Sequence, residues 1–458
     1  MKVIVCGSGQ VGFNIARYLA SENADVTVID QAPELIQKIT DSLDVSGIVG
    51  FASHPDVLER AGAADADMVI AVTYADEVNM VACQVCHSLF EVPTKIARVR
   101  HQSYLDPLWL NLFSSQNMPI DVIISPEIEV ARAIARRLQI PGAFDVINLA
   151  EGKVSLIGVH VRDDTPIIDT PLRQLTDLFP DLHIVVVAIN RRGRGIVAHG
   201  DDELRPGDDV YFVCETAHLS RAMMTFGHEE KEARRLLIIG GGNIGLNLAK
   251  TVEHAYPQVQ LKVIEIDKAR AEMVAQTLNR TVVLHGDALD VEILDEANIE
   301  ATETVIAVSN DDEVNILSSL LAKRHGARRA ITLVNSTSYS QLVGSLGIDT
   351  VVSPRAITVS TILQHVRRGR IRAVHSLSDG IGEIIEAEAL ETSSLVGRPL
   401  RDAQLPRGMA VGALIRDEEV IIPRGDTIIR AGDLVVLFAA AEAVKKVEKL
   451  FSVKLEFF

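Results

Sequence analysis

Two glycine-rich segments, "GSGQVG" and "GGGNIG", have a spacing that suits phosphate binding. In the first, Gly7, Gly9 and Gly12 follow a Val/Ile-rich run and precede a helical pattern. The first glycine of such a turn permits the tight bend, the second lets the backbone approach a pyrophosphate, and the third allows close packing of helix on sheet. The helix N-terminus also offers unpaired N–H groups to the phosphates. The candidate cofactor-binding residues of this turn are Gly7, Ser8, Gly9, Gln10, Val11 and Gly12.

An acidic residue supplies the second part of the predicted site. Asp30 ends the next Val/Ile-rich run, where a carboxylate can accept hydrogen bonds from both hydroxyls of an adenosine ribose. The same carboxylate repels a 2′-phosphate. We therefore expect NAD or an adenine nucleotide rather than NADP, with a Rossmann turn that holds no ligand as the alternative.

Polar residues follow the predicted fourth strand, "MVIAVTY". Thr73 and Tyr74 stand at its carboxyl end, the edge at which open α/β sheets bind ligands. Asp76 is interpreted as the N-cap of the following helix. Asn79 is a further candidate ligand residue, although "DEVN" is also explained by helix capping alone.

Two arginines end the predicted fifth strand, "KIARVR". Residues 98 and 100 of a strand point the same way, so Arg98 and Arg100 are predicted to aim two guanidinium groups at a polyphosphate. The second copy of the motif has Leu333 and Asn335 instead. The alternative is a solvated strand end or a salt bridge.

The second glycine segment is an altered copy of the first. Glu265 takes the place of the ribose acid, and Asp267 and Asp287 add further negative charge. This site therefore has more acid and less base than the first, which makes it poorer for phosphate-rich ligands. Its candidate residues are Gly240, Gly241, Gly242, Asn243, Ile244, Gly245 and Glu265.

Alternating strands and helices position these residues. Such a pattern is typical of a parallel sheet covered on both faces, so the fold class is α/β with two doubly wound Rossmann domains. In the first copy the predicted strands are 2–6, 26–30, 47–50, 68–73 and 95–100, and the predicted helices are 11–21, 33–42, 55–61 and 76–89.

A small α+β segment follows each Rossmann unit. "GDDELRPGDDVYFV" in the first half aligns with "GDTIIRAGDLVVLF" in the second. The predicted domains are a first Rossmann domain, a crossover helix with a first small domain, and a repetition of both, at 1–124, 125–228, 232–352 and 353–458.

Composition limits the classes of function. The chain has 458 residues and a net charge of −17, which argues against nucleic-acid binding and against adhesion to anionic lipid. No apolar run is long enough for a membrane span or a signal peptide, so a cytoplasmic location is expected. The four cysteines indicate no disulfide framework. "CQVCH" has the spacing of a haem attachment motif, but small core thiols are the preferred interpretation, and no metal site is predicted.

Catalytic groups are missing from the pattern. No His–Asp or Tyr–Lys constellation faces the predicted nucleotide, and no P-loop lysine occurs, so the chain is predicted not to be an enzyme. Two predicted nucleotide sites without catalytic residues indicate a sensor. A soluble NAD-dependent oxidoreductase is the alternative.

The segments "KVIVCGSGQVGFNIARYLA" and "ADADMVIAVTYADEVNMVACQVCHSLF", with the four-part order, resemble the bacterial TrkA family of tandem RCK (regulator of potassium conductance) proteins. The resemblance implies a regulatory subunit of Trk potassium uptake at the cytoplasmic face of the inner membrane. It further implies a homo-tetrameric gating ring beneath a TrkH- or TrkG-type potassium-translocating subunit, responding to NAD(H) and ATP/ADP. Regulation of another channel or antiporter through the same ring is a further alternative.

The resemblance also assigns residues. It implies a ligand-binding turn from Gly7 to Val11, the ribose acid Asp30, the strand-end pair Thr73 and Tyr74, and the phosphate contact Arg98. In the second copy it implies the turn 240–244 with Glu265. Phe51 stands where the second copy keeps "GDA", so a hydrogen bond near the adenosine is not expected in the first site.

Overall fold

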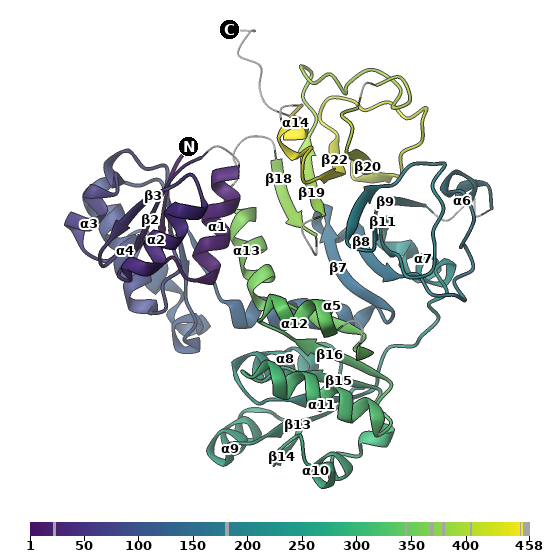
Figure 1. Cartoon of the computed structure of the whole chain (residues 1–458), viewed down its shortest axis with the longest axis horizontal. Helices are drawn as coiled ribbons and strands as arrows, with labels where there is room; N and C mark the ends of the chain where they lie inside the picture. Colours follow the sequence, from purple (N-terminus) through teal and green to yellow (C-terminus); the bar gives the residue numbers. More distant parts are fainter. Residues whose placement is uncertain are drawn as a thin grey trace. The chain divides into compact units, whose positions relative to one another are not determined.

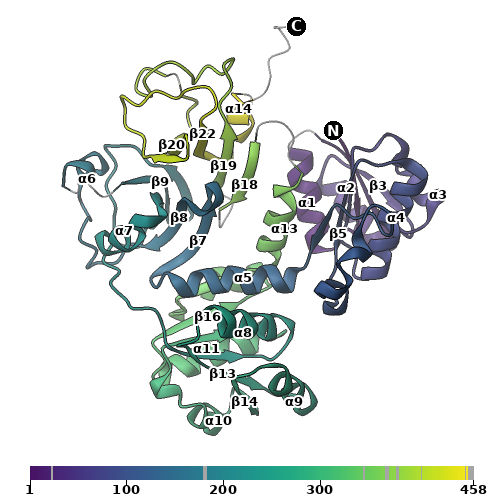
Figure 2. The same ribbon diagram turned by 180° about the vertical axis from the view of Figure 1, so that it is seen from behind.

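The computed structural model describes residues 1–21, 24–178, 183–343, 346–366, 371–377, 381–403, 405–448 and 450–451. It separates into two compact units, one made of residues 1–130 with 353–365 and the other of residues 131–352 with 366–458. Figures 1 and 2 show the ribbon from opposite sides. Within the described residues, no helix has the length and apolar character needed to cross a membrane.

The first unit is built on a six-stranded parallel sheet of order β3-β2-β1-β4-β5-β6, the strand order of a Rossmann fold. This confirms the predicted α/β class. Its strands are β1 (Lys2–Cys6), β2 (Asp25–Asp30), β3 (Ser46–Val49), β4 (Met68–Ala71), β5 (Thr94–Arg98) and β6 (Val122–Ile124). Its helices are α1 (Gln10–Ser21), α2 (Pro33–Ser42), α3 (Pro55–Arg60), α4 (Asp76–Phe90), the first turns of α5 (Pro126–Gln139), and the 3-10 segments 63–65, 102–105 and 107–113.

Several element boundaries differ from the sequence prediction by one to two residues, and one strand was not predicted. Strand β5 ends at Arg98, so Arg100 lies outside the sheet and the two arginines do not share a strand face. The short strand β6 was not predicted; it adds a sixth strand beside β5 and leads into α5.

Cysteine side chains belong to the core of this unit. Cys6 of β1 packs with Cys83 and Cys86 of α4, and all three are fully buried. Burial raises the pKa of the Cys86 thiol to about 12 and that of Cys6 well above its usual range. The interpretation of "CQVCH" as small core thiols therefore agrees with their position.

Helix α13 (Pro354–Gln364) follows the second Rossmann sheet in sequence but lies in the first unit, beside α1. It begins at Pro354, and the Ser353 hydroxyl accepts a hydrogen bond from the Ala356 amide at 3.3 Å. The strand–helix alternation alone does not reveal this placement, because it depends on long-range contacts.

The second unit contains the second Rossmann sheet, of order β14-β13-β12-β15-β16-β17 and parallel throughout. Its strands are β12 (Arg235–Ile239), β13 (Gln260–Glu265), β14 (Val282–His285), β15 (Thr304–Ala307), β16 (Arg329–Leu333) and β17 (Thr350–Val352). Its helices are α8 (Asn243–Ala255), α9 (Lys268–Thr277), α10 (Val291–Glu296), α11 (Asp312–Arg324), α12 (Thr337–Val343) and the 3-10 segment 299–301.

Two five-stranded antiparallel sheets complete the second unit. The first has the order β10-β9-β11-β8-β7 and the second β18-β19-β22-β20-β21, and a shared core that includes Tyr211 and Phe438 joins them. The strands are β7 (Ala143–Leu149), β8 (Val154–His160), β9 (Ile184–Arg191), β10 (Arg194–Val197), β11 (Asp209–Glu215), β18 (Ile371–Ser376), β19 (Gly382–Glu388), β20 (Met409–Arg416), β21 (Glu419–Ile421) and β22 (Leu434–Ala440). The helices are α6 (Leu172–Leu178), α7 (Leu219–Thr225), α14 (Val444–Glu448) and the 3-10 segments 150–152 and 216–218.

Candidate functional site

The first glycine turn joins β1 to α1 in the conformation that its spacing predicts. Gly7 has φ +104°, which favours glycine, and its N–H donates to the Ile29 carbonyl at 2.7 Å. A Cβ atom on Gly12 would lie 1.8 Å from the Gly7 carbonyl oxygen, so helix and turn approach too closely for any side chain. A Cβ atom on Gly9 would meet nothing within 4 Å. Gly7 and Gly12 therefore build the turn, while Gly9 faces open space that a ligand can enter.

Asp30 at the end of β2 is tied to this turn. Its carboxylate accepts hydrogen bonds from the Ser8 amide at 2.7 Å and from the Ala32 amide at 3.0 Å. Gln10 and Val11 form the first turn of α1. The structure thus brings the glycine turn and the predicted ribose acid into direct contact.

Thr73 and Asn79 form a second connection at the same edge of the sheet. The Asn79 Oδ1 atom accepts from the Thr73 amide at 2.8 Å and from its hydroxyl at 2.7 Å. Its Nδ2 atom donates to the Thr73 carbonyl at 3.2 Å and to the Arg98 carbonyl at 2.9 Å. Because Asn79 is fully buried and both ends of its amide are used, its side chain fixes the ends of β4 and β5 behind the surface that a ligand would meet.

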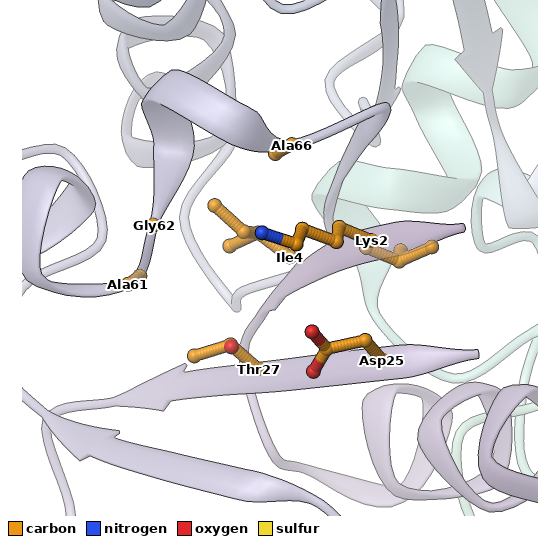
Figure 3. Close-up of a pocket in the computed structure, with 8 residues that line it drawn as sticks. Lys2, Ile4, Asp25, Thr27, Ala61, Gly62 and Ala66 are labelled. Atoms are coloured by element: carbon orange, nitrogen blue, oxygen red, sulfur yellow. The ribbon is translucent and has the colours of Figure 1, made fainter. Parts of the chain in front are cut away.

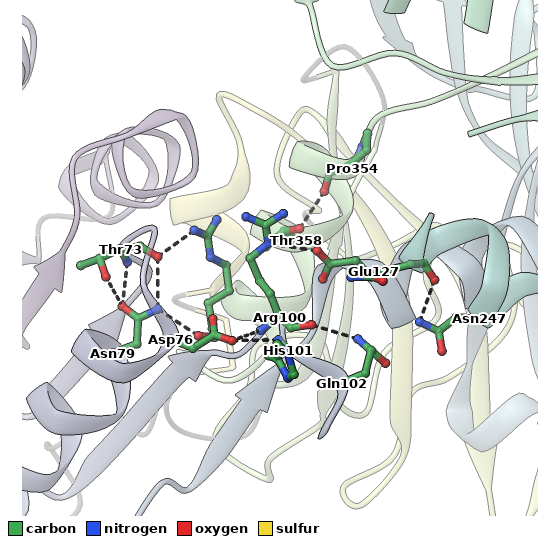
Figure 4. A network of polar contacts seen from close by, with 12 residues as sticks. Thr73, Asp76, Asn79, Arg100, His101, Gln102, Glu127, Asn247, Pro354 and Thr358 are labelled. Atoms are coloured by element: carbon green, nitrogen blue, oxygen red, sulfur yellow. Dashed lines mark hydrogen bonds and ion pairs between the residues drawn. The ribbon is translucent and has the colours of Figure 1, made fainter. Parts of the chain in front are cut away.

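Asp76 corrects the capping interpretation. The N-cap position of α4 is Ala75, which makes no side-chain cap, and Asp76 is the first helical residue. Its Oδ2 atom accepts from the Arg100 amide at 2.9 Å and the His101 amide at 2.8 Å (Figure 4). The carboxylate therefore holds the loop after β5 rather than the start of the helix.

Arg98 lies half-buried at the end of β5. Its Nη2 atom donates to the Thr73 carbonyl at 2.7 Å, while its Nε atom is buried and has no hydrogen-bond partner. Among the described residues, no carboxylate pairs with this guanidinium. Burial and the neighbouring Arg100 lower the pKa of Arg98, so the surroundings disfavour the unpaired charge.

Arg100 is engaged differently from the prediction. Its Nε atom donates to the Glu127 carboxylate of α5 at 3.0 Å, which raises the pKa of Arg100 (Figure 4). The guanidinium also lies 5.7 Å from the centre of the Tyr74 ring, which is largely exposed. The two arginines are therefore held differently: Arg98 has no carboxylate partner among the described residues, and Arg100 is held by a salt bridge.

Unpaired polar atoms gather at this edge of the first sheet. Five polar side-chain atoms, at the end of β5 or in the segments that follow β1, β4 and β6, are buried and have no hydrogen-bond partner among the residues that the structure describes: Ser8 Oγ, Asp76 Oδ1, Arg98 Nε, Ser125 Oγ and Glu127 Oε2. In the described part of residues 232–352, no buried side-chain atom lacks a partner. Buried polar groups are nearly always paired in folded proteins, so such a cluster indicates a ligand or ordered water.

These groups fit an adenine nucleotide or dinucleotide. The Ser8 hydroxyl and Arg98 Nε can donate to phosphate oxygens, and the unpaired carboxylate oxygens can accept from ligand hydroxyl or amide groups or from water. Asp30 adds a ribose acceptor beside the open face of Gly9.

The second glycine turn has the same backbone. Gly240 has φ +103°, and a Cβ atom on Gly245 would lie 2.0 Å from the Gly240 carbonyl oxygen. Glu265 accepts from the Gly241 amide at 2.6 Å, just as Asp30 does from Ser8. Gly242 is the N-cap of α8, and Asn243, Ile244 and Gly245 form its first turn.

Arg270 of α9 is a residue of the second turn that the sequence analysis missed. Its Nε atom donates to the Gly241 carbonyl at 2.7 Å and its Nη2 atom to Asn243 Oδ1 at 3.1 Å. The second turn therefore carries a basic group, contrary to the interpretation that this site has less base than the first. The sequence carries a signal for this residue: α9 begins with "KAR" at 268–270, whereas the corresponding helix of the first copy begins with "PEL" at 33–35 and has no basic residue there.

A hollow at the opposite edge of the first sheet is unrelated to these residues. It lies at the beginning of β1 and β2 and is lined by Lys2, Ile4, Asp25, Thr27 and Ala66, among others (Figure 3). Ligands of doubly wound sheets bind at the carboxyl ends of the strands, so this hollow does not compete with the glycine turn as a candidate site.

Comparison with known proteins settles the family. The TrkA-N domain model matches residues 3–126 and 236–354, and the TrkA-C domain model matches 156–227 and 384–452. A curated "Trk system potassium uptake protein TrkA" from Azorhizobium caulinodans is 56% identical over 458 residues and is covered completely, as is this chain. The chain belongs to the TrkA family. The corresponding protein of Halomonas elongata is 43% identical, with complete coverage of both chains.

A solved structure supports the same architecture. The GsuK channel bound to NAD superposes with a TM-score of 0.59 and 19% identity, covering 98% of this chain and 78% of that one. At this identity the likeness concerns the fold. The tandem arrangement predicted from the TrkA resemblance is thus confirmed by the family models and by the sheets.

Proposed function

We propose that this TrkA-family chain is a nucleotide-sensing regulatory subunit of a Trk-type potassium uptake system, not an enzyme. The observation that carries the proposal is the cluster of unpaired buried polar atoms beside the first glycine turn. The relatives of this chain from Azorhizobium caulinodans and Halomonas elongata are named as Trk system potassium uptake proteins. A regulatory subunit needs such a site to read the metabolic state of the cell.

The ligands proposed for the first site are NAD(H) and ATP/ADP. Gly9 offers its open backbone to the phosphates, Asp30 accepts from the adenosine ribose, and Arg98 supplies an unpaired cation. Thr73 and Tyr74 complete the edge of the site. The structural neighbour GsuK binds NAD in its solved complex, which supports the assignment.

The second site is proposed to bind nucleotide less readily. Arg270 already bonds to the Gly241 carbonyl and to Asn243, so a ligand must displace a contact that the first turn does not have. Glu265 accepts a hydrogen bond from the Gly241 amide in the same way as Asp30 accepts one from the Ser8 amide. No cluster of unpaired buried atoms accompanies it among the described residues.

The proposed route of regulation begins at the Arg100–Glu127 salt bridge. Glu127 lies in the first turn of α5, directly after β6. A polyphosphate that draws Arg100 toward itself weakens the link to Glu127 and changes how the start of α5 is held. The salt bridge therefore connects the nucleotide edge of the sheet to the helix that leads out of the domain.

A ring of subunits would sum such changes. We propose a homo-tetramer beneath a TrkH- or TrkG-type potassium-translocating membrane subunit, with membrane association only through that partner. Coupling between sites is typically about 1–3 kcal/mol. Moving a two-state assembly from 1:99 to 99:1 requires about 5.5 kcal/mol, so four sites of modest preference suffice together.

Isothermal titration calorimetry of the full chain with NADH, NAD, ATP, ADP and NADP tests the nucleotide assignment. The proposal predicts binding of the adenine nucleotides and dinucleotides, weaker binding of NADP, and loss of the tightest site in a Ser8→Ala/Arg98→Gln variant. Binding unaffected by this variant would contradict the assignment to the first site. Arg270→Gln, which removes the basic side chain bonded to the second glycine turn, is the control in the other copy and should leave the tightest site intact.

A further inference from the structure

Three potential metal ligands meet in the first antiparallel sheet domain. His183, Glu215 and His218 each bring one ligating atom within 4.8 Å of the others. His183 is exposed, and the side chains of Glu215 and His218 are about one-third exposed, so an ion can reach the cluster from solvent. None of the three contributes to the nucleotide sites.

Strand pairing places these residues together. Strands β9 and β11 are antiparallel, with Ile184 opposite Cys214. His183 precedes β9 and Glu215 ends β11, so the two residues stand at the same end of this pair. His218 ends the 3-10 turn that follows β11. The backbone, rather than a chance side-chain rotation, therefore produces the cluster.

The repeated domain provides an internal comparison. The alignment of the two copies puts Gly408, Ala440 and Ala443 at the positions of His183, Glu215 and His218. A Cβ atom on Gly408 would lie 2.8 Å from the Cβ atom of Ala443 and 3.5 Å from that of Ala440.

The three positions therefore converge in both copies. The strand register agrees as well, because Met409 is opposite Ala439 in the second copy as Ile184 is opposite Cys214 in the first. Only the first copy carries ligating side chains at the point of convergence.

One atom of the first cluster is buried without a hydrogen bond. Within the described part of the chain, His218 Nδ1 has no hydrogen-bond partner, although it lies 3.3 Å from Glu215 Oε2. Bonds of about 2.0–2.2 Å at tetrahedral angles separate two zinc ligands by roughly the same distance. His183 has φ +24°, a region that favours glycine, and its counterpart Gly408 has φ +92°. Histidine therefore occupies a backbone position at which the other copy has glycine.

We propose that His183, Glu215 and His218 form a binding site for a divalent transition-metal ion, with Zn²⁺ the preferred occupant. Two imidazoles and one carboxylate are a ligand set that zinc uses when a fourth position is left to water or to another ligand. Imidazole nitrogen selects against Mg²⁺ and Ca²⁺, which prefer oxygen. Motif spacing predicted no metal site, because these ligands come from segments that are distant in the sequence: the residue before β9, the end of β11 and the turn after it.

The bound ion would clamp the end of β11 to the start of β9. The three ligands lie far from both glycine turns in the sequence and belong to a different domain, so we treat occupancy of this site as a property separate from nucleotide binding. Metal binding would then stabilise the first small domain by an amount that grows with the logarithm of the free ion concentration above the dissociation constant.

Zinc titration of the full chain, monitored by competition with a chromophoric chelator, tests the site. The expected result is one Zn²⁺ per chain in the wild type and an affinity lower by about 100-fold or more in His183→Ala/His218→Ala, because loss of even an outer partner costs about 10–100-fold. His199→Ala is the matched control: His199 lies in the same domain, also beside a carboxylate, Asp202, and outside the cluster. Its removal should leave the affinity unchanged.

A second readout keeps the test independent of folding. Co²⁺ bound to the wild type should show the visible bands of a tetrahedral site, and Glu215→Gln should weaken them while nucleotide affinity measured by calorimetry stays as in the wild type. Equal zinc affinity in the wild type and the double variant, or equal loss in His199→Ala, would overturn the proposal.

Discussion

The carboxylate of Asp30 accepts a 2.7 Å hydrogen bond from the Ser8 amide and so couples the end of β2 to the glycine turn. Glu265 makes the same contact with Gly241 at 2.6 Å in the second copy. One acid therefore holds the turn in each domain, and we propose that the same acid also presents an oxygen to a ribose.

Replacing Asp30 should separate these two purposes. Asp30→Ala removes both, and we expect nucleotide affinity at the first site to fall by about 100-fold, since hydrogen bonds to charged groups contribute about 1.5–3 kcal/mol. Asp30→Asn keeps one acceptor for the Ser8 amide and should keep the turn while still weakening ribose binding. Calorimetry with NADH measures both, and Glu265→Gln is the control in the other copy. Unchanged affinity in both Asp30 variants would contradict the ribose assignment.

The glycines of the first turn should differ in how they tolerate a methyl group. Gly12→Ala places Cβ 1.8 Å from the Gly7 carbonyl oxygen, so we expect destabilisation by about 3 kcal/mol or more, the upper range for overpacking. Gly9→Ala adds Cβ to open space and should leave the thermal unfolding midpoint unchanged while weakening nucleotide binding. Thermal unfolding and calorimetry on both variants check the pair. Wild-type affinity in Gly9→Ala would show that no phosphate approaches this backbone.

The two arginines should contribute unequally to polyphosphate binding. Arg98 has an unpaired buried Nε atom, whereas Arg100 must leave Glu127 before it can reach a ligand. We therefore expect Arg98→Gln to lower the affinity for ATP by about 100-fold and the affinity for NAD by less. A charge-assisted contact contributes about 1.5–3 kcal/mol, and ATP carries more phosphate charge than NAD. Arg100→Gln should have the smaller effect on ATP. Equal losses for ATP and NAD would identify both arginines as structural.

The four cysteines should be unreactive in the folded chain. All are buried, and burial raises the pKa of the Cys86 and Cys214 thiols to about 12 and that of Cys83 higher still. Thiols with raised pKa values stay protonated near pH 8, and the stability they contribute is present below their unfolded pKa of about 8.5 and lost as the pH rises toward 12. A disulfide reagent at pH 8 should therefore modify no thiol rapidly until denaturant is added. A fast-reacting thiol in native protein would contradict this burial.

The sequence was sufficient for the fold because strand and helix periods, glycine spacing and the internal repeat are local or repeated signals. Strands β1 to β5 and helices α1 to α4 lie within a few residues of their predicted positions. The short strand β6 and the edge strands β7 and β10 were missed, since three to seven residues beside stronger runs carry little periodic signal.

The sequence pattern points to candidate residues but not to their pairing. Glycine spacing and strand ends predict Asp30, Thr73 and Arg98, and the structure places all three at the carboxyl ends of strands in the first sheet. The salt bridge from Arg100 to Glu127 and the buried amide of Asn79 depend on contacts between segments that no local pattern records. The His183 cluster was missed for the same reason.

The most direct test of control by the first site is potassium flux through a TrkH- or TrkG-type partner reconstituted in vesicles with this chain, with and without nucleotide. We expect NADH and ATP to change the flux with the wild-type chain, Ser8→Ala/Arg98→Gln to abolish this response, and Arg270→Gln to retain it. A nucleotide response that persists unchanged in Ser8→Ala/Arg98→Gln would contradict control by the first site.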